Sequence, residues 1–161
     1  MEFRTKVDIP RATFSIAPCE RMLFVGSCFA DNMGRKFAED KFRAVVNPFG
    51  VMYNPASIMH TVERYEGEAP RVAVLTLGTN HIYILRETGE IVDNCNKRPQ
   101  RLFEERSLTA DECVGYLMRA VRHLQSRSEG DSHRQSDTLR QVRLPRQHAL
   151  QSHPAARCGH A

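Results

Sequence analysis

A hydroxyl and a thiol stand side by side directly after a glycine, in the triplet Gly26-Ser27-Cys28. Either side chain can attack a carbonyl carbon, which is the first step of ester hydrolysis and of acyl transfer. The apolar run 22–25 before the triplet and the helix-compatible segment after it place the pair where a buried strand gives way to a helix. A helix N-terminus at that point would stabilise a thiolate or a developing oxyanion. The structural alternative is a small-residue turn with a buried, inert cysteine.

Three further blocks support the chemical interpretation. With the block that contains the triplet, there are four, and they occur along the chain in the order "GSCFA" (26–30), "NPFGVMYNP" (47–55), "TLGTNHIY" (76–83) and "VDNCNKRP" (92–99). Together they resemble the GSCFA family, a branch of the SGNH (GDSL-like) hydrolase superfamily, over residues 1–125. The resemblance implies an SGNH-like three-layer α/β/α fold with a parallel sheet. It also implies an esterase or acyltransferase that acts on a small-molecule acyl ester or an acylated glycan.

The resemblance also assigns site residues. The first block aligns with the superfamily's Gly-Asp-Ser, which puts the nucleophile on Cys28, and Ser27 is the alternative if the turn is shifted by one residue. Gly50 resembles the second-block glycine, whose N–H helps to form an oxyanion hole. Gly78 and Asn80 resemble the Gly-x-Asn of the third block, with the Asn80 amide as another oxyanion donor. A cap at the end of a strand is the structural alternative for Asn80.

The general base is harder to place. The family pattern usually reads Asn-Cys-His-Lys where this chain has Asn96 in place of the histidine. His60, His81 and His123 lie on helix or hairpin stretches, and we interpret them as surface or packing residues. The superfamily takes its base from a histidine late in the domain, so the resemblance implies a base beyond residue 125.

The elements that must position these residues follow an α/β order. Apolar runs closed by glycine or proline predict parallel strands at 22–26, 42–46 and 72–77. Helical spacing predicts helices at about 30–41, 55–65 and 109–124, and the alternation around Thr88-Gly89 predicts a hairpin over 81–94. In the first helix the apolar spacing includes Phe29 and Met33, and Thr109 with Glu112 forms a capping box for the last helix.

After Gln125 the composition changes. Residues 126–161 contain six Arg and four of the seven His, but no Lys, Ile or aromatic residue, which predicts a disordered Arg/His/Gln/Ser-rich tail. The codons of residues 131–154 can also be read in a frame that starts at the second nucleotide of each codon. Because the third bases are degenerate, this frame can encode a sequence with a strand, a histidine and an Asn…Ser-Lys segment. We therefore favour a frameshift near residues 126–130, which would leave a fragment of the domain that is itself inactive. The rival interpretation is a disordered basic arm that binds nucleic acid or an acidic surface.

Charge and hydropathy exclude several classes of function. The tail supplies three of the four net positive charges, so the chain up to residue 125 has no nucleic-acid footprint. No run approaches the ~20 apolar residues needed to span a bilayer, and residues 1–15 lack the apolar core of a secretory signal. The five cysteines form no C-x-x-C pair. We expect a cytoplasmic protein without metal, cofactor, membrane or nucleic-acid partner.

Overall fold

A three-stranded parallel sheet forms the centre of the chain, whose computed structural model describes residues 10–93, 95 and 98–132. The strands are β1 (Arg21–Gly26), β2 (Arg43–Val46) and β3 (Val72–Thr76), in the order β2-β1-β3. Leu23 of β1 lies opposite Val45 on one side and Ala73 on the other. The three predicted parallel strands are confirmed to within a residue or two at their ends.

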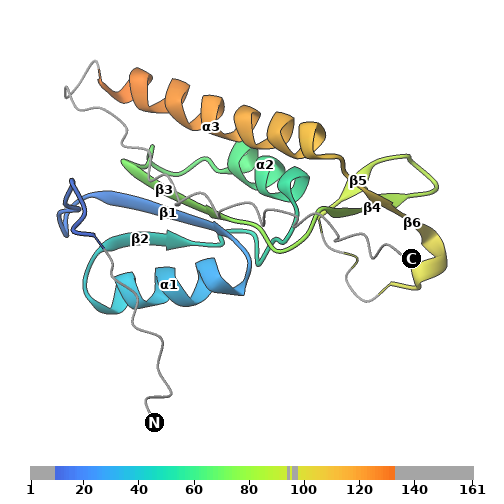
Figure 1. The fold of residues 1–161 in the computed structure, drawn as a ribbon, viewed down its shortest axis with the longest axis horizontal. Coiled ribbons are helices and arrows are strands. Elements are labelled where there is room, and N and C mark those ends of the chain that lie inside the picture. The colour runs from blue at the N-terminus through green and yellow to red at the C-terminus, as the bar shows by residue number, and fades with distance from the viewer. Residues whose placement is uncertain (1–9, 94, 96–97, 133–161) are drawn as a thin grey trace, which may run out of the picture.

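Helices cover both faces of this sheet, as the alternation of side chains along β1 requires. Met22 and Phe24 point to one face, where they pack with Ala30 of α1 (Cys28–Glu39). Leu23 and Val25 point to the other face, against α2 (Pro55–Arg64) and α3 (Ala110–Ser132). Figure 1 shows α1 below the sheet and the other two helices above it. The mixed α/β class with a parallel sheet is therefore confirmed.

A second, antiparallel sheet continues beyond the carboxyl ends of the parallel strands (Figure 1). It consists of β4 (His81–Leu85), β5 (Ile91–Val92) and β6 (Phe103–Ser107), in the order β5-β4-β6, with a short 3-10 helix (Gln100–Leu102) before β6. The predicted hairpin is β4–β5. Strand β6 was not predicted, because its sequence "FEERS" carries three charges and buries only its first residue.

The buried face of α1 differs from the sequence prediction. Phe29 and Met33 are 60% and 38% exposed, whereas Ala30 and Gly34 are buried. The helix lies so close to the sheet that a Cβ at Gly34 would come within 2.6 Å of Val46 Cγ2. Small residues therefore form much of the contact, together with Phe37, which the same spacing includes and which packs against Phe24, whereas Phe29 and Met33 are turned outward.

The last helix continues past Gln125 to Ser132, so it includes the first seven residues of the stretch 126–161 that was predicted as a tail. Arg127 ties this extension to the end of α2, because its guanidinium donates to the carbonyl oxygens of Tyr65 and Gly67 and lies 5.4 Å from the centre of the Tyr65 ring. The tail predicted over 133–161, with its possible nucleic-acid arm, lies outside the described residues. Within the described part of the chain, no helix combines the length and the apolar character that a membrane crossing demands.

Candidate active site

Gly26 is the last residue of β1, and its geometry excludes a side chain. Its φ is +141°, and a Cβ there would overlap the carbonyl oxygen of Thr76 and lie 2.6 Å from Thr76 Oγ1. The backbone of β1 thus comes so close to the end of β3 that only glycine fits at position 26. This glycine therefore determines the turn after β1, and the turn places Ser27 and Cys28 at the start of α1.

Ser27 is buried, at 8% exposure, and serves as the N-cap of α1. Its Oγ accepts a hydrogen bond from the N–H of Phe29 at 3.3 Å and lies 3.0 Å from Thr76 Oγ1. Its own N–H donates to the same Thr76 oxygen at 3.0 Å. This hydroxyl is therefore held by local structure on two sides.

Cys28 is the first residue of α1, and it is exposed with a free thiol. It directly follows the N-cap residue, Ser27. Its sulfur therefore lies at the N-terminus of a helix of 12 residues, at the carboxyl edge of the parallel sheet. Of the two candidate nucleophiles, the thiol is the accessible one.

Asn47 organises the turn, a role that was not predicted from the sequence. Its Oδ1 accepts from the N–H of Gly26 at 2.9 Å, and its own N–H donates to the carbonyl of Phe24 at 2.8 Å. Its Nδ2 lies 3.5 Å from Oδ1 of Asp31. The residue is 8% exposed and has a φ of +40°, a conformation that asparagine tolerates better than most residues. The sequence feature that could have indicated this role is an asparagine directly after a strand, β2, whose carboxyl end lies at this edge of the sheet.

Gly50 occupies the same loop, and its φ of +96° favours glycine. Its N–H donates to the carbonyl of Asn47 at 2.8 Å, which closes a tight turn. Because a backbone N–H has one hydrogen, Gly50 cannot serve as an oxyanion donor while that turn is closed.

Gly78 and Asn80 are also engaged in structural hydrogen bonds. The N–H of Gly78 donates to the carbonyl of Tyr53 at 2.8 Å, and a Cβ there would lie 2.9 Å from Tyr53 Cδ1. The Asn80 amide donates to the carbonyl of Leu108 at 2.8 Å, which joins β3 and β4 to the start of α3. One of its two amide hydrogens remains for other partners.

Two of the three described histidines, His60 and His81, pair with carboxylates elsewhere. His60 Nδ1 lies 2.9 Å from Oδ1 of Asp93, whose other oxygen is bound by Arg64 at 2.9 Å. His81 Nδ1 lies 3.0 Å from Glu105 Oε1 on the antiparallel sheet. Among the described residues, no histidine is hydrogen-bonded to Ser27 or to Cys28.

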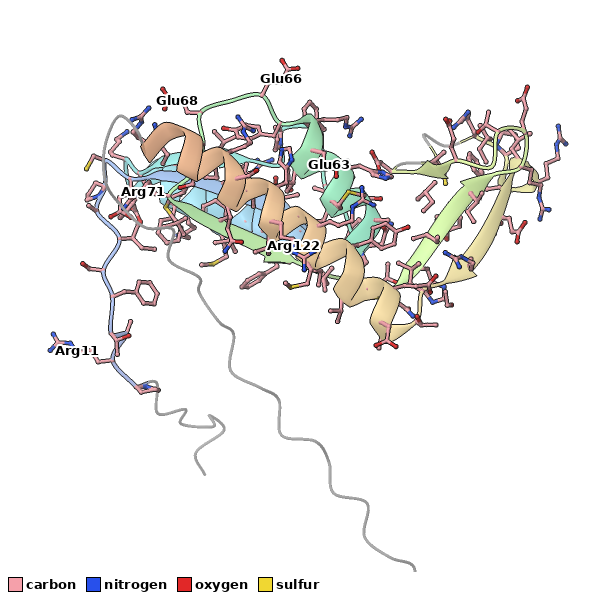
Figure 2. All side chains as sticks on the ribbon, turned by 90° about the horizontal axis from the view of Figure 1, so that it is seen from above. Arg11, Glu63, Glu66, Glu68, Arg71 and Arg122 are labelled. Atoms are coloured by element: carbon pink, nitrogen blue, oxygen red, sulfur yellow. The ribbon has the colours of Figure 1, made fainter. Side chains whose placement is uncertain are left out.

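Other features of the described chain lie away from this turn. A cavity of about 480 Å³ is lined by Arg21, Arg43, Tyr65 and Glu68 at the opposite end of the parallel strands. Figure 2 labels Glu68 and Arg71 at that end, far from the antiparallel sheet. No cluster of three or more metal-ligating side chains occurs in residues that the structure describes.

Comparison with known proteins identifies a family. The model of the GSCFA family matches residues 21–71 and 68–131, which includes Ser27, Cys28, Gly50, Gly78 and Asn80. No curated protein matches the chain, and no solved structure does. The matched range ends one residue beyond the stretch 126–130 in which a frameshift is expected. Since the match covers well over half of the 161 residues, the chain belongs to the GSCFA family.

Proposed function

We propose that the turn at Cys28 is the nucleophile site of an SGNH-like ester hydrolase or acyltransferase that acts on a small-molecule acyl ester or an acylated glycan. One observation carries the proposal: an exposed free thiol at a helix N-terminus follows a turn that Gly26, Asn47 and Thr76 hold in place. A merely structural cysteine would gain nothing from this support, because inert cysteines are usually buried.

The chemistry is an acyl transfer to sulfur. The Cys28 thiolate attacks the ester carbonyl, the C–O bond to the alcohol breaks, and the alcohol leaves with the proton that the thiol released. The N–H groups in the first turn of α1 have no acceptor within the helix, and those not engaged as the Phe29 N–H is by Ser27 Oγ would stabilise the oxyanion. The second amide hydrogen of Asn80 is a further donor, while Gly50 contributes by shaping the loop.

The second half of the reaction needs a base that activates water. The family resemblance puts that base beyond residue 125, in the stretch that the expected frameshift would have replaced. Loss of a general base lowers the rate by about two to four orders of magnitude. With the expected frameshift, the 161-residue chain is therefore inactive in turnover: we expect it to form the thioester but to release it only very slowly.

Burst kinetics test the proposal. When the chain is mixed with excess p-nitrophenyl ester, we expect a fast release of about one p-nitrophenol per chain, followed by a much slower phase. The Cys28→Ala variant should lose the burst. The Cys19→Ala variant is the matched control, since Cys19 is also an exposed free thiol, and it should keep the burst. A burst that survives in Cys28→Ala would refute the assignment.

A non-catalytic ligand-binding module is the second candidate. It is favoured by the hydrogen bonds that already engage Ser27 Oγ, the Gly50 N–H and one Asn80 amide hydrogen. Such a module would bind an acyl or glycan ligand at the same edge of the sheet. It would show no burst with any ester, which separates the two candidates in one experiment.

A further inference from the structure

Asp93 lies directly after β5, and both oxygens of its carboxylate are bound by side chains of α2. Its Oδ1 lies 2.9 Å from His60 Nδ1, and its Oδ2 accepts from the Arg64 guanidinium at 2.9 Å. His60 and Arg64 are one helical turn apart, so they share a face of α2. The Asp93 side chain is 16% exposed, so this carboxylate is largely shielded from water. It fixes the end of the antiparallel hairpin to α2 at two points.

Arg64 also contacts the β2–α2 loop, residues 47–54. Its guanidinium carbon lies 4.7 Å from the centre of the Phe49 ring, which is a cation–π contact. The Arg64 side chain and Phe49 are each about half exposed. A long exposed side chain samples many rotamers unless a partner restrains it. The ion pair with Asp93 restrains Arg64, and so it holds the guanidinium against the Phe49 ring.

The β2–α2 loop holds Gly26 by both of its backbone groups. Asn47 Oδ1 accepts from the Gly26 N–H at 2.9 Å, and the Met52 N–H donates to the Gly26 carbonyl at 2.9 Å. Phe49 lies between Asn47 and Met52 in the sequence. A displacement of the loop would therefore displace Gly26 and, with it, the turn that leads into α1.

We propose that Asp93 is a positioning residue for the Cys28 turn, and that it acts through Arg64 and Phe49 on the β2–α2 loop. The inference rests on the proposed function, because a fixed loop matters when the thiol must meet an ester carbonyl in one orientation. Small misplacements of an attacking group lower the rate of reaction. The proposal also gives a role to the block "VDNCNKRP", which contains Asp93 and has none in the acyl transfer described above. The alternative is an ion pair that joins β5 to α2 and affects stability alone.

The test compares Asp93→Asn with Glu63→Gln. Asp93→Asn keeps the size of the side chain and removes the charge that holds Arg64. Glu63→Gln is the matched control, because Glu63 lies on the same helix (Figure 2) and its ion pair, 3.2 Å from Arg119, is directed to α3 instead of the loop.

Two rate constants are measured under conditions in which urea unfolding shows each variant to be fully folded. One is the acylation of Cys28 in the burst phase, at several ester concentrations. The other is the alkylation of Cys28 by iodoacetamide, followed by peptide mass spectrometry, which does not depend on the proposed function.

In Asp93→Asn both rate constants should fall by about two- to fivefold, the size expected when one exposed cation–π contact is lost. Alkylation slows because a displaced turn no longer presents the first N–H groups of α1 to the thiolate. The ester concentration that gives half of the limiting burst rate should stay the same, since Asp93 does not touch the ester. Alkylation of Cys19, also an exposed free thiol, should be unchanged, and Glu63→Gln should change none of these quantities.

Phe49→Leu provides a second variant, which should lower the two rate constants by a similar factor. Because Asp93 acts through the ring, the double variant Asp93→Asn/Phe49→Leu should be no slower than Phe49→Leu alone. Unchanged rate constants in Asp93→Asn, whatever happens to its stability, would overturn the inference, as would effects that multiply in the double variant. If the unaltered chain shows no burst but alkylation follows the expected pattern, the acyl-transfer function is refuted and the positioning role is supported.

Discussion

At the scale of single residues, the site depends on one glycine and one asparagine. Gly26 lets β1 approach Thr76, and the Asn47 side chain satisfies the Gly26 N–H at the start of the turn. The triplet Gly26-Ser27-Cys28 predicted a turn with a nucleophile, and the structure has the turn. The supporting roles of Asn47 and Thr76 could not be predicted, because they depend on which strand ends meet in space.

Replacing Gly26 by Ala should be strongly destabilising. The added Cβ would overlap the Thr76 carbonyl in a backbone conformation, φ +141°, that L residues rarely adopt. We expect the free energy of unfolding in urea to fall by about 2–4 kcal/mol. Gly115→Ala is the control, because this glycine lies inside α3 with open space around it. Its substitution should raise stability by about 0.5–1 kcal/mol. Equal effects of the two substitutions would contradict the account of the turn.

At the scale of helices and strands, the correct predictions came from short sequence patterns such as capping residues, apolar runs and turn residues. The capping box of α3 is confirmed, since Glu112 Oε2 accepts from the Thr109 N–H at 2.8 Å and the Glu112 N–H donates to Thr109 Oγ1 at 3.3 Å. The parallel strands and the hairpin were predicted from apolar runs and turn residues. The orientation of α1 was not, because the contact of Gly34 with Val46 decides which face is buried. Strand β6 is recognisable only from its pairing with β4.

The capping box should make stability depend on pH. The pKa of Glu112 is lowered, first by the hydrogen bond from the Thr109 N–H, then by the Thr109 hydroxyl, and to a lesser degree by Arg106. A carboxyl with a depressed pKa contributes stability above its ordinary value of 4.5, and this contribution is lost as the pH falls through the lowered value. We expect Glu112→Gln to reduce the loss of stability below that pH.

Thr109→Val provides the comparison for this prediction. It removes the hydroxyl but keeps the backbone N–H that is the main cause of the lowered pKa. We would measure the free energy of unfolding in urea for both variants and the unaltered chain between neutral pH and about pH 3. The pH dependence should differ less from that of the unaltered chain in Thr109→Val than in Glu112→Gln. An unchanged acid dependence in Glu112→Gln would show that the capping carboxylate has no share in it.

At the scale of the whole molecule, the candidate site and a cavity of about 480 Å³ lie at opposite ends of the parallel strands. The turn with Cys28 lies at the carboxyl end, toward the antiparallel sheet (Figure 1), while the cavity lined by Arg43 and Glu68 lies at the other end. Ligands of parallel α/β sheets bind at the carboxyl end. The topology therefore supports the Cys28 turn as the candidate site.

The most direct test of the account is to identify the acylated atom. The chain would be incubated with a p-nitrophenyl ester, quenched in acid, digested, and analysed by peptide mass spectrometry. We predict a single acyl group on the peptide that contains Cys28, removable by hydroxylamine at neutral pH as a thioester is, and no acylation of Cys19. A stable acyl group on Ser27, or equal acylation of Cys19 and Cys28, would contradict the claim that the turn presents Cys28 as its nucleophile.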